Sequence, residues 1–446
     1  MDSPHDTTYV RAWKDASFPI LRPLDFEPLV DTLAKARVVM LGEATHGTHE
    51  FYELRRLISE WLIVKHGFRF LAVEGDWPPC ADLNHYLHRV PAKGSAREAL
   101  ESFHRWPTWM WANAEIVRLA EWMRSHNSRT LDKMRAGFYG LDVYSLFESM
   151  QAVVDQLEKI NPFLARRAKV RYQCFDAYHR NEKAYARSLL RFPEGCESEV
   201  IEVLQDLLRL RLSEVEARIP GVSAALFDAR QNARVVKNAE SYYRALIQAD
   251  DESWNVRDRH MLETLDQLLV HHSEFGNPAR CIVWAHNTHV GDYRATDMAG
   301  EGLVNLGGLA RQKYGADNVA LVGFGTHEGT VIASHSWDGP IERLRIPPAR
   351  SGSVESAGHQ LAGEFKAEIF ASVFGSSASS SLEEFRDHRA IGVVYDPRRE
   401  RWGNYVPTSL SRRYDAFVFV DRTQALEPFI VGADLREIPE TWPRGQ

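Results

Sequence analysis

The chain has 446 residues, of which 44% are hydrophobic and 26% charged, the composition of a globular protein with a large core. Its 54 Lys and Arg against 61 Asp and Glu give a net charge of −7, which disfavours a broad basic surface for nucleic acid. No apolar run approaches the ~20 residues of a membrane-spanning helix, and the N-terminus has no signal-peptide core, so we expect a cytoplasmic protein without a membrane partner.

Short apolar runs rich in β-branched residues recur along the chain, and each ends abruptly at polar residues or glycine. Runs of this kind, separated by helical segments, are typical of strands buried on both faces of a largely parallel sheet. The helical spacing of apolar residues in 49–65 predicts a helix after the first run. The predicted strands are 37–41, 70–73, 137–141, 281–285, 319–324, 390–395 and 416–420.

The pattern changes in residues 146–275, where heptad-like segments with many Arg and Glu replace the strand-like runs. We therefore predict an α/β fold in which a largely parallel sheet is flanked by helices. Residues 1–145 and 276–446 would form this discontinuous core. Residues 146–275 would be an inserted all-helical subdomain that covers a cleft.

The four cysteines lie far apart in the sequence and have no CxxC spacing, which argues against a cysteine zinc site and against a disulfide scaffold. A reduced protein is therefore expected. The cysteines are Cys80, Cys174, Cys196 and Cys281.

Titratable residues follow directly after the first four predicted strands. Because ligands bind outside the carboxyl ends of strands in open parallel sheets, we expect Glu43, His46, Glu74 and His286 to converge on one cleft. In chain order the residues after the strands are Glu43 and His46, Glu74 and Asp76, Asp142, and finally His286 and His289.

The acids around His46 indicate a catalytic role for this histidine. A neighbouring carboxylate raises the basicity of an imidazole and fixes its tautomer, as a general base near neutral pH requires. Arg55 follows on the same predicted helix and could pair with an acid or bind a substrate oxygen. Glu74 ends a buried strand, where a carboxylate needs a partner such as Arg or His. Asp76 and Asp142 fit a helix cap as well as they fit a site.

His286 and His289 are three residues apart, so they could share a face and bind a divalent metal with Glu43 or Glu74. A strand-end turn with one histidine packed beneath the site fits this spacing equally well. Among the tryptophans, most would be core residues, and we place Trp77 and Trp109 at a pocket for a large apolar ligand. Asp258 is expected to be a structural ion-pair partner.

Several familiar catalytic motifs are absent. The segment 49–53 lacks the second histidine of a metalloprotease motif, and there is no GxSxG nucleophile elbow. The phosphate-binding GxxxxGK[ST] motif is missing, and 323–329 does not have the spacing of a dinucleotide site. A histidine and acid cluster without a recognisable serine or cysteine nucleophile remains.

The ordered set of motifs resembles the signature of the erythromycin esterase family, some of whose members are named after succinoglycan biosynthesis. The resemblance is carried by LGEATHGTHE at 41–50 and AVEGDWP at 72–78. It spans nearly the whole chain, with further matches at 109–111, 138–142, 257–261, 284–290, 404–407 and 414–417.

The resemblance implies that water hydrolyses a macrolide lactone or a similar small-molecule ester, with no covalent intermediate. We expect no cofactor, with a divalent metal as the alternative. It implies that His46 is the general base and Glu43 its acidic partner, while Glu74, Arg55 and His286 position the water and polarise the carbonyl. The expected substrate-binding residues are His289, Asp76, Trp77, Trp109 and Asp142.

Two alternatives use the same cleft. In one, Glu43, His46, Glu74 and His286 hold a divalent metal that activates water. In the other, the cleft binds an apolar ligand without turnover. The sequence does not indicate an oligomeric state.

Overall fold

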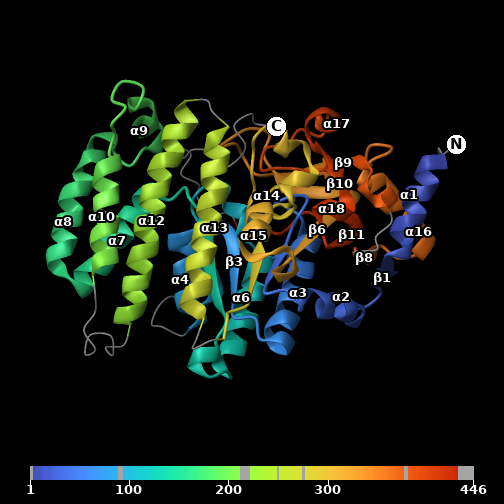
Figure 1. The fold of residues 1–446 in the computed structure, drawn as a ribbon, viewed down its shortest axis with the longest axis horizontal. Coiled ribbons are helices and arrows are strands. Elements are labelled where there is room, and N and C mark those ends of the chain that lie inside the picture. The colour runs from blue at the N-terminus through green and yellow to red at the C-terminus, as the bar shows by residue number, and fades with distance from the viewer. Residues whose placement is uncertain are drawn as a thin grey trace.

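A mixed sheet forms the centre of the computed structural model, which describes residues 4–88, 94–210, 221–248, 251–273, 277–375 and 380–429 (Figure 1). In this part of the chain the sheet has nine strands in the order β1-β8-β11-β6-β2-β5-β3-β4, and β7 pairs with β6. The strands are β1 (Ser17–Pro19), β2 (Val38–Leu41), β3 (Phe70–Asp76), β4 (Gly137–Asp142), β5 (Cys281–Trp284), β6 (Val319–Ala333), β7 (Glu342–Ile346), β8 (Ile369–Val373) and β11 (Ala416–Thr423). A separate pair joins β9 (Phe385–Arg389) to β10 (Tyr405–Ser409).

The six central strands, from β11 to β4, are parallel, so the predicted α/β class is confirmed. Strands β2 and β5 lie in the middle of the sheet, and every residue of both is buried. Their uninterrupted apolar sequences fit this position, because helices cover both faces of a parallel sheet. The antiparallel strands β1, β8 and β7 extend the sheet beyond this parallel block.

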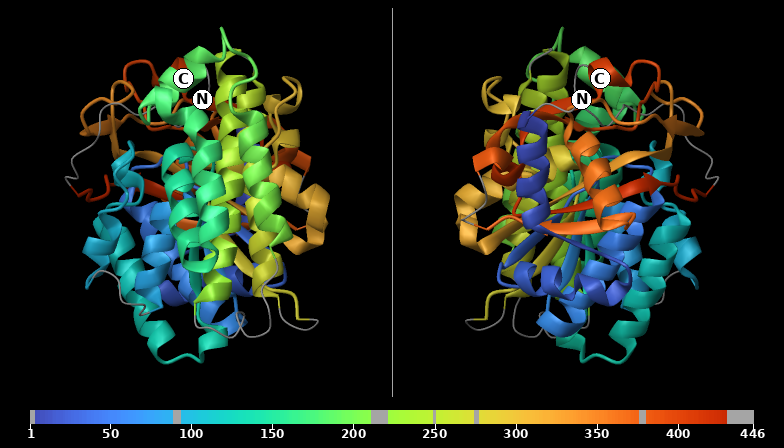
Figure 2. Two further views of the ribbon diagram at one scale, coloured as in Figure 1. Left: turned by 90° about the vertical axis from the view of Figure 1, so that its left-hand side faces the viewer. Right: turned by 90° about the vertical axis from the view of Figure 1, so that its right-hand side faces the viewer.

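Helices pack on both faces of the sheet (Figure 2). One face is covered by α2 (Glu27–Leu33), α3 (His49–His66), α4 (Trp77–Leu87), α5 (Ala96–Leu100) and α6 (Ala114–Ser128). The other is covered by α1 (Pro4–Asp15), α13 (Glu252–His272), α15 (Leu306–Tyr314) and α16 (Val354–Phe365). Short helices lie among the later loops: α14 (Asn287–Val290), α17 (Glu400–Gly403) and α18 (Leu410–Arg413).

Between β4 and β5 the described residues form helices and no strand. Besides α13 these are α7 (Leu146–Ile160), α8 (Pro162–Tyr172), α9 (Glu182–Ser188), α10 (Glu197–Arg209) and α12 (Val222–Ile247). They lie at one end of the molecule in Figure 1 and share a hydrophobic core that includes Val153, Leu157, Val203 and Val236. A disulfide joins Cys174 to Cys196 in this region, contrary to the expectation from the cysteine spacing.

The predicted strand at 390–395 is wrong. Only isolated bridges form there, from Ile391 to Thr45 and from Val394 to Ser334, and the segment instead lines the cleft described below. None of the described helices combines the length and apolar character needed to cross a membrane.

Candidate active site

A cleft of about 270 Å³ lies beyond the carboxyl ends of the central strands. Loops after β2 and β5 contribute histidines to it, β3 contributes a carboxylate, and α13 contributes an arginine and a tryptophan. The opposite wall comes from the segments around 390–394 and 403–406. The lining residues are His46, Glu74, Trp254, Arg257, His286, Thr288, His289, Asp297, Met298, Glu301, Trp337, Ala390, Gly392, Val394, Gly403, Asn404, Tyr405 and Val406.

The turn after β2 places His46 in the cleft and Glu43 directly behind it. Glu43 is buried and accepts a hydrogen bond from His46 Nδ1 on Oε1 (3.0 Å) and one from Arg55 Nη2 on Oε2 (2.6 Å). Because both carboxylate oxygens accept, the proton of the neutral His46 ring lies on Nδ1, and Nε2 keeps a lone pair. His46 therefore has the tautomer that a general base needs.

Arg55 lies beneath this pair and does not line the cleft. It is fully buried on α3, with its guanidinium 4.6 Å from the ring centres of both Tyr52 and Trp284. Its contact with Glu43 gives it the role of orienting the acid. The expectation that it also binds a substrate oxygen does not fit its position.

Gly42 does not have a positive φ, so backbone conformation is not the reason for a glycine here. The reason is the space available, because neighbouring atoms approach Gly42 closely. A Cβ at Gly42 would collide with Oδ1 of Asn287 and lie 2.9 Å from the carbonyl oxygen of Val322. The absence of a side chain at Gly42 therefore brings the β2 turn against the β5 turn, and with it His46 against His286.

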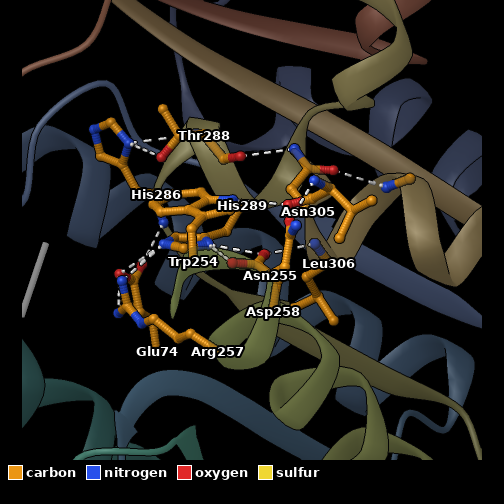
Figure 3. Close-up of polar contacts among 12 residues, drawn as sticks. Glu74, Trp254, Asn255, Arg257, Asp258, His286, Thr288, His289, Asn305 and Leu306 are labelled. Carbon is orange, nitrogen blue, oxygen red and sulfur yellow. Dashed lines mark hydrogen bonds and ion pairs between the residues drawn. The ribbon is translucent and has the colours of Figure 1, made fainter. Parts of the chain in front are cut away.

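The His286 ring lies 4.8 Å from the His46 ring, measured between centres, and has the opposite tautomer. Its Nδ1 accepts the backbone N–H of Thr288 (3.3 Å) at the start of α14 and lies 2.9 Å from the Thr288 hydroxyl. The ring proton is therefore on Nε2, which is buried and has no hydrogen-bond partner among the described residues. In Figure 3 this nitrogen points away from the labelled network.

Electrostatics keep His286 neutral. Burial holds the pKa of His286 well below its usual range, and protonation of His46 would lower that pKa further, although Glu74 and the nearby Ala44 carbonyl act in the opposite direction. A neutral imidazole with its proton on Nε2 is a hydrogen-bond donor that does not need acidic conditions.

Glu74 connects the two histidine turns to α13. Its Oε2 accepts the backbone N–H of His286 (2.7 Å), and its Oε1 accepts Nη2 of Arg257 (2.8 Å). Burial alone would raise the pKa of Glu74, but the charges of His289 and Arg257, and that of His46 when it is protonated, outweigh burial and hold the pKa of Glu74 well below its usual range. Arg257 is itself held by both oxygens of Asp142 at the end of β4 (2.9 and 2.7 Å).

His289 is buried at the side of this network (Figure 3). Its Nδ1 lies 2.9 Å from both oxygens of Asp258, and its Nε2 lies 3.3 Å from Oε1 of Glu74. Although burial lowers the pKa of His289, the charges of Asp258 and Glu74 raise it to about 9. Trp254 stacks on the ring at 4.5 Å between centres, which fixes its orientation.

The structure thus brings together four of the residues expected at the cleft: His46, Glu74, His286 and His289. Glu43 and Asp142 lie one layer behind, in contact with the cleft residues His46 and Arg257, and Arg55 lies behind Glu43.

The other three expected residues, Asp76, Trp77 and Trp109, lie elsewhere. Asp76 pairs with Arg105 (2.8 Å) beside a separate void of about 40 Å³. Trp77 turns toward Tyr139 at the start of α4, in a second cavity. Trp109 is fully buried against Trp106 in the sheet core.

Sequence reasoning missed Arg257, Trp254 and Trp337 as cleft residues. Arg257 stands in a segment that carried the family resemblance, which was a usable signal. Asp258 fits the expected role of an ion-pair partner, but its partner is a cleft histidine. We find no sequence signal for Trp337.

The carboxylates in this region are already paired with cations. Arg55 forms an ion pair with Glu43, and Arg257 forms one with Glu74. Both carboxylates of the metal-dependent alternative are therefore paired with a guanidinium. Among the described residues, no group of three or more His, Cys, Asp or Glu side chains is arranged to hold a metal ion.

Comparisons with known proteins agree on one family. A family model described as erythromycin esterase matches residues 63–423. The chain is 22% identical over 356 residues to an erythromycin esterase type II of Escherichia coli. This match covers 75% of this chain and 80% of that protein.

Solved structures share the fold. A succinoglycan biosynthesis protein has a TM-score of 0.76 at 20% identity, and the match covers 96% of this chain and all of that one. A Bacillus cereus protein has a TM-score of 0.77 at 19% identity, covering 95% and 99% of the two chains. A mutant of erythromycin esterase EreC in its open conformation has a TM-score of 0.64 at 16% identity, covering 95% and 98%.

Proposed function

Because the chain belongs to the erythromycin esterase family, we propose that it hydrolyses a lactone or another carboxylic ester of macrolide type, using water activated by His46. The observation that carries this proposal is the pair of imidazoles 4.8 Å apart with opposite tautomers. One ring offers a lone pair to a water molecule, and the other offers an N–H to a carbonyl oxygen. Ester hydrolysis needs both functions at one carbonyl group.

In the proposed reaction His46 Nε2 takes a proton from water while the water oxygen attacks the ester carbonyl carbon. The carbonyl π electrons move onto the oxygen, where His286 Nε2–H donates to the developing negative charge. As the carbonyl re-forms, the bond to the alcohol oxygen breaks, and His46 returns its proton to that oxygen. The products are one carboxylic acid and one alcohol, which remain in one molecule if the substrate is a lactone.

The remaining charged residues support this pair. Glu43 orients His46 and stabilises the imidazolium that forms during the attack, and Arg55 fixes Glu43. Glu74 accepts the backbone N–H of His286 and thereby fixes the position of that turn. None of the described lining residues is a serine or a cysteine, which supports direct attack by water without an acyl-enzyme.

The pairing of Glu43 and Glu74 with arginines supports hydrolysis without a resident metal. We propose that the helical region 146–275 helps to select the substrate, because α13 supplies Trp254 and Arg257 to one wall of the cleft. The aromatic rings of Trp254, Trp337 and Tyr405 offer apolar surface to a bulky substrate.

Incubation of metal-stripped protein with erythromycin, followed by mass spectrometry of the products, tests this function. We expect the antibiotic to gain the mass of one water, and we expect no gain with His46→Ala. An unchanged mass with wild-type protein would contradict the macrolide substrate. The same assay with a panel of simple lactones and 4-nitrophenyl esters would then test the ester hydrolase activity itself.

A further inference from the structure

A second cavity of about 430 Å³ lies between α4, α12 and α13, away from the catalytic histidines. Helix α12 packs against both α4 and α13, and α13 runs along the sheet in Figure 1. Arg69, just before β3, and Tyr139 on β4 close the cavity from the side of the sheet. The lining residues are Arg69, Trp77, Ala81, Asn84, His85, His88, Asp132, Arg135, Tyr139, Ala224, Phe227, Asp228, His271 and His272.

Aromatic rings form a continuous wall of this cavity. Trp77 stacks on Tyr139 with 5.7 Å between ring centres and 23° between planes, and Phe227 stacks on His271 at 3.8 Å and 15°. The two stacked pairs touch each other through Trp77 and Phe227, whose ring centres are 6.0 Å apart in an edge-to-face arrangement. Flat rings held in this way offer stacking surface to another planar ring.

Arg69 brings a cation to the same cavity. Its backbone is fixed by two hydrogen bonds, to the carbonyl of Arg280 (2.8 Å) and from the N–H of Gly137 (3.0 Å). Its guanidinium donates to the sulfur of Met134 (3.6 Å), and its Nε is buried without a hydrogen-bond partner among the described residues. A guanidinium with unused donors is suited to a carboxylate.

The two acids that line this cavity already have hydrogen-bond or ion-pair partners other than Arg69. Asp228 accepts hydrogen bonds from Trp77 Nε1 (2.6 Å) and from Gln156 Nε2 (3.0 Å), and Asp132 pairs with Arg135 (2.6 Å).

His272, which lines the cavity beside Arg69, is disfavoured as a cation. Burial lowers the pKa of this histidine, and the charges of His271, Arg69 and His88 lower it further, to about 3.

We propose that this second cavity is a binding site for a small aromatic carboxylate. The ring of the ligand would lie on the wall formed by Trp77, Tyr139 and Phe227, and its carboxylate would bind the guanidinium of Arg69. The cavity is within the size range of ordinary small-molecule sites. This site is separate from the proposed esterase cleft, and it requires no turnover.

Isothermal titration calorimetry of the full chain with 1-naphthoate tests the proposal. We expect one site per chain, at least about tenfold weaker binding to Arg69→Met, and recovery of most of the affinity in Arg69→Lys. Phe227→Ala should also weaken binding. The uncharged analogue 1-naphthylmethanol and the cation 1-naphthylmethylamine should each bind at least about tenfold more weakly than the acid.

Trp337→Ala, which alters the cleft and leaves the second cavity intact, should bind 1-naphthoate as tightly as wild type. Equal binding to wild type and Arg69→Met would overturn the proposal, as would no binding of 1-naphthoate at millimolar concentration. Loss of binding in Trp337→Ala would also overturn it, because the ligand would then occupy the cleft. Circular dichroism and the Tm of each variant establish that it is folded.

Discussion

His46 and His286 are both held through Nδ1, but in opposite senses: His46 donates to Glu43, and His286 accepts from the backbone of Thr288. The two ring centres are 4.8 Å apart, so a base and a hydrogen-bond donor stand side by side in one cleft. This difference follows from local structure. An acid precedes His46 by three residues, whereas His286 caps a short helix whose N–H groups can only donate.

The donor role of His286 predicts a large effect on turnover. His286→Phe keeps a ring of similar size and removes the N–H, so kcat should fall by about 10²- to 10³-fold with little change in KM. Thr288→Val is the matched control, because it removes the hydroxyl and keeps the backbone N–H that fixes the tautomer. A much smaller loss is expected for it, and steady-state kinetics would show both. A His286→Phe variant with nearly normal kcat would contradict the donor role.

The buried pair of Glu43 and Arg55 should show strong coupling in unfolding experiments. Either Glu43→Gln or Arg55→Met leaves a buried charge without its partner, and each should lower the free energy of unfolding by about 3–5 kcal/mol. The double variant should lose clearly less than the sum of the single changes. Urea denaturation of the four proteins measures this, and additive losses would show that the pair is not coupled. Glu43→Gln should also lower kcat, because its amide no longer fixes the tautomer of His46.

The raised pKa of His289, about 9, predicts the behaviour of the protein in alkaline solution. Since the folded-state pKa lies above the ordinary value of about 6.5, the ion pairs of His289 stabilise the fold fully below that value. Their contribution is lost as the pH rises through about 9, and kcat/KM should fall over the same interval because Glu74 loses a partner.

Asp258→Asn tests the origin of this alkaline decline. The substitution removes the main charge that raises the pKa of His289, so the decline in kcat/KM should begin at lower pH. Asp266→Asn, on the same helix and paired with Lys313, serves as the control and should leave the profile unchanged. The same profile in wild type and Asp258→Asn would mean that another group causes the decline.

Chelation separates the proposed mechanism from a metal-dependent hydrolase. Because arginines occupy Glu43 and Glu74, dialysis against EDTA should leave kcat/KM unchanged. Addition of zinc or manganese to the dialysed protein should bring no gain. Loss of activity on dialysis that either metal restores would favour the metal-dependent alternative.

The central parallel strands could be predicted because their sequences are apolar throughout, as burial on both faces requires. The segment 390–395 is equally apolar, but it crosses the end of the sheet and forms only single bridges to Thr45 and Ser334. An apolar sequence indicates that a segment is buried. It does not distinguish a strand inside the sheet from a segment packed beside the cleft. The short strands β7, β9 and β10 each carry charged or proline residues, so their sequences gave no strand signal.

Within the site, the residues at strand ends could be predicted because parallel topology brings those ends to one edge. Asp76 and Trp77 show the limit of this rule, because they also follow a strand but turn toward Arg105 and Tyr139. Arg257 reaches Glu74 from 183 positions away in the sequence, on a helix whose packing no local pattern specifies. The disulfide between Cys174 and Cys196 depends in the same way on how α9 and α10 fold back against their neighbours.

The most direct test of the account is chemical rescue of His46→Ala with imidazole, with the rate of ester hydrolysis as the readout. His46→Ala should lose at least about 100-fold in kcat/KM, and added imidazole should restore part of the rate above an enzyme-free control. His49→Ala, which removes a neighbouring histidine paired with Glu115 outside the cleft, should hydrolyse the ester at the wild-type rate. A His46→Ala variant that retains wild-type activity would contradict the assignment of His46 as the base.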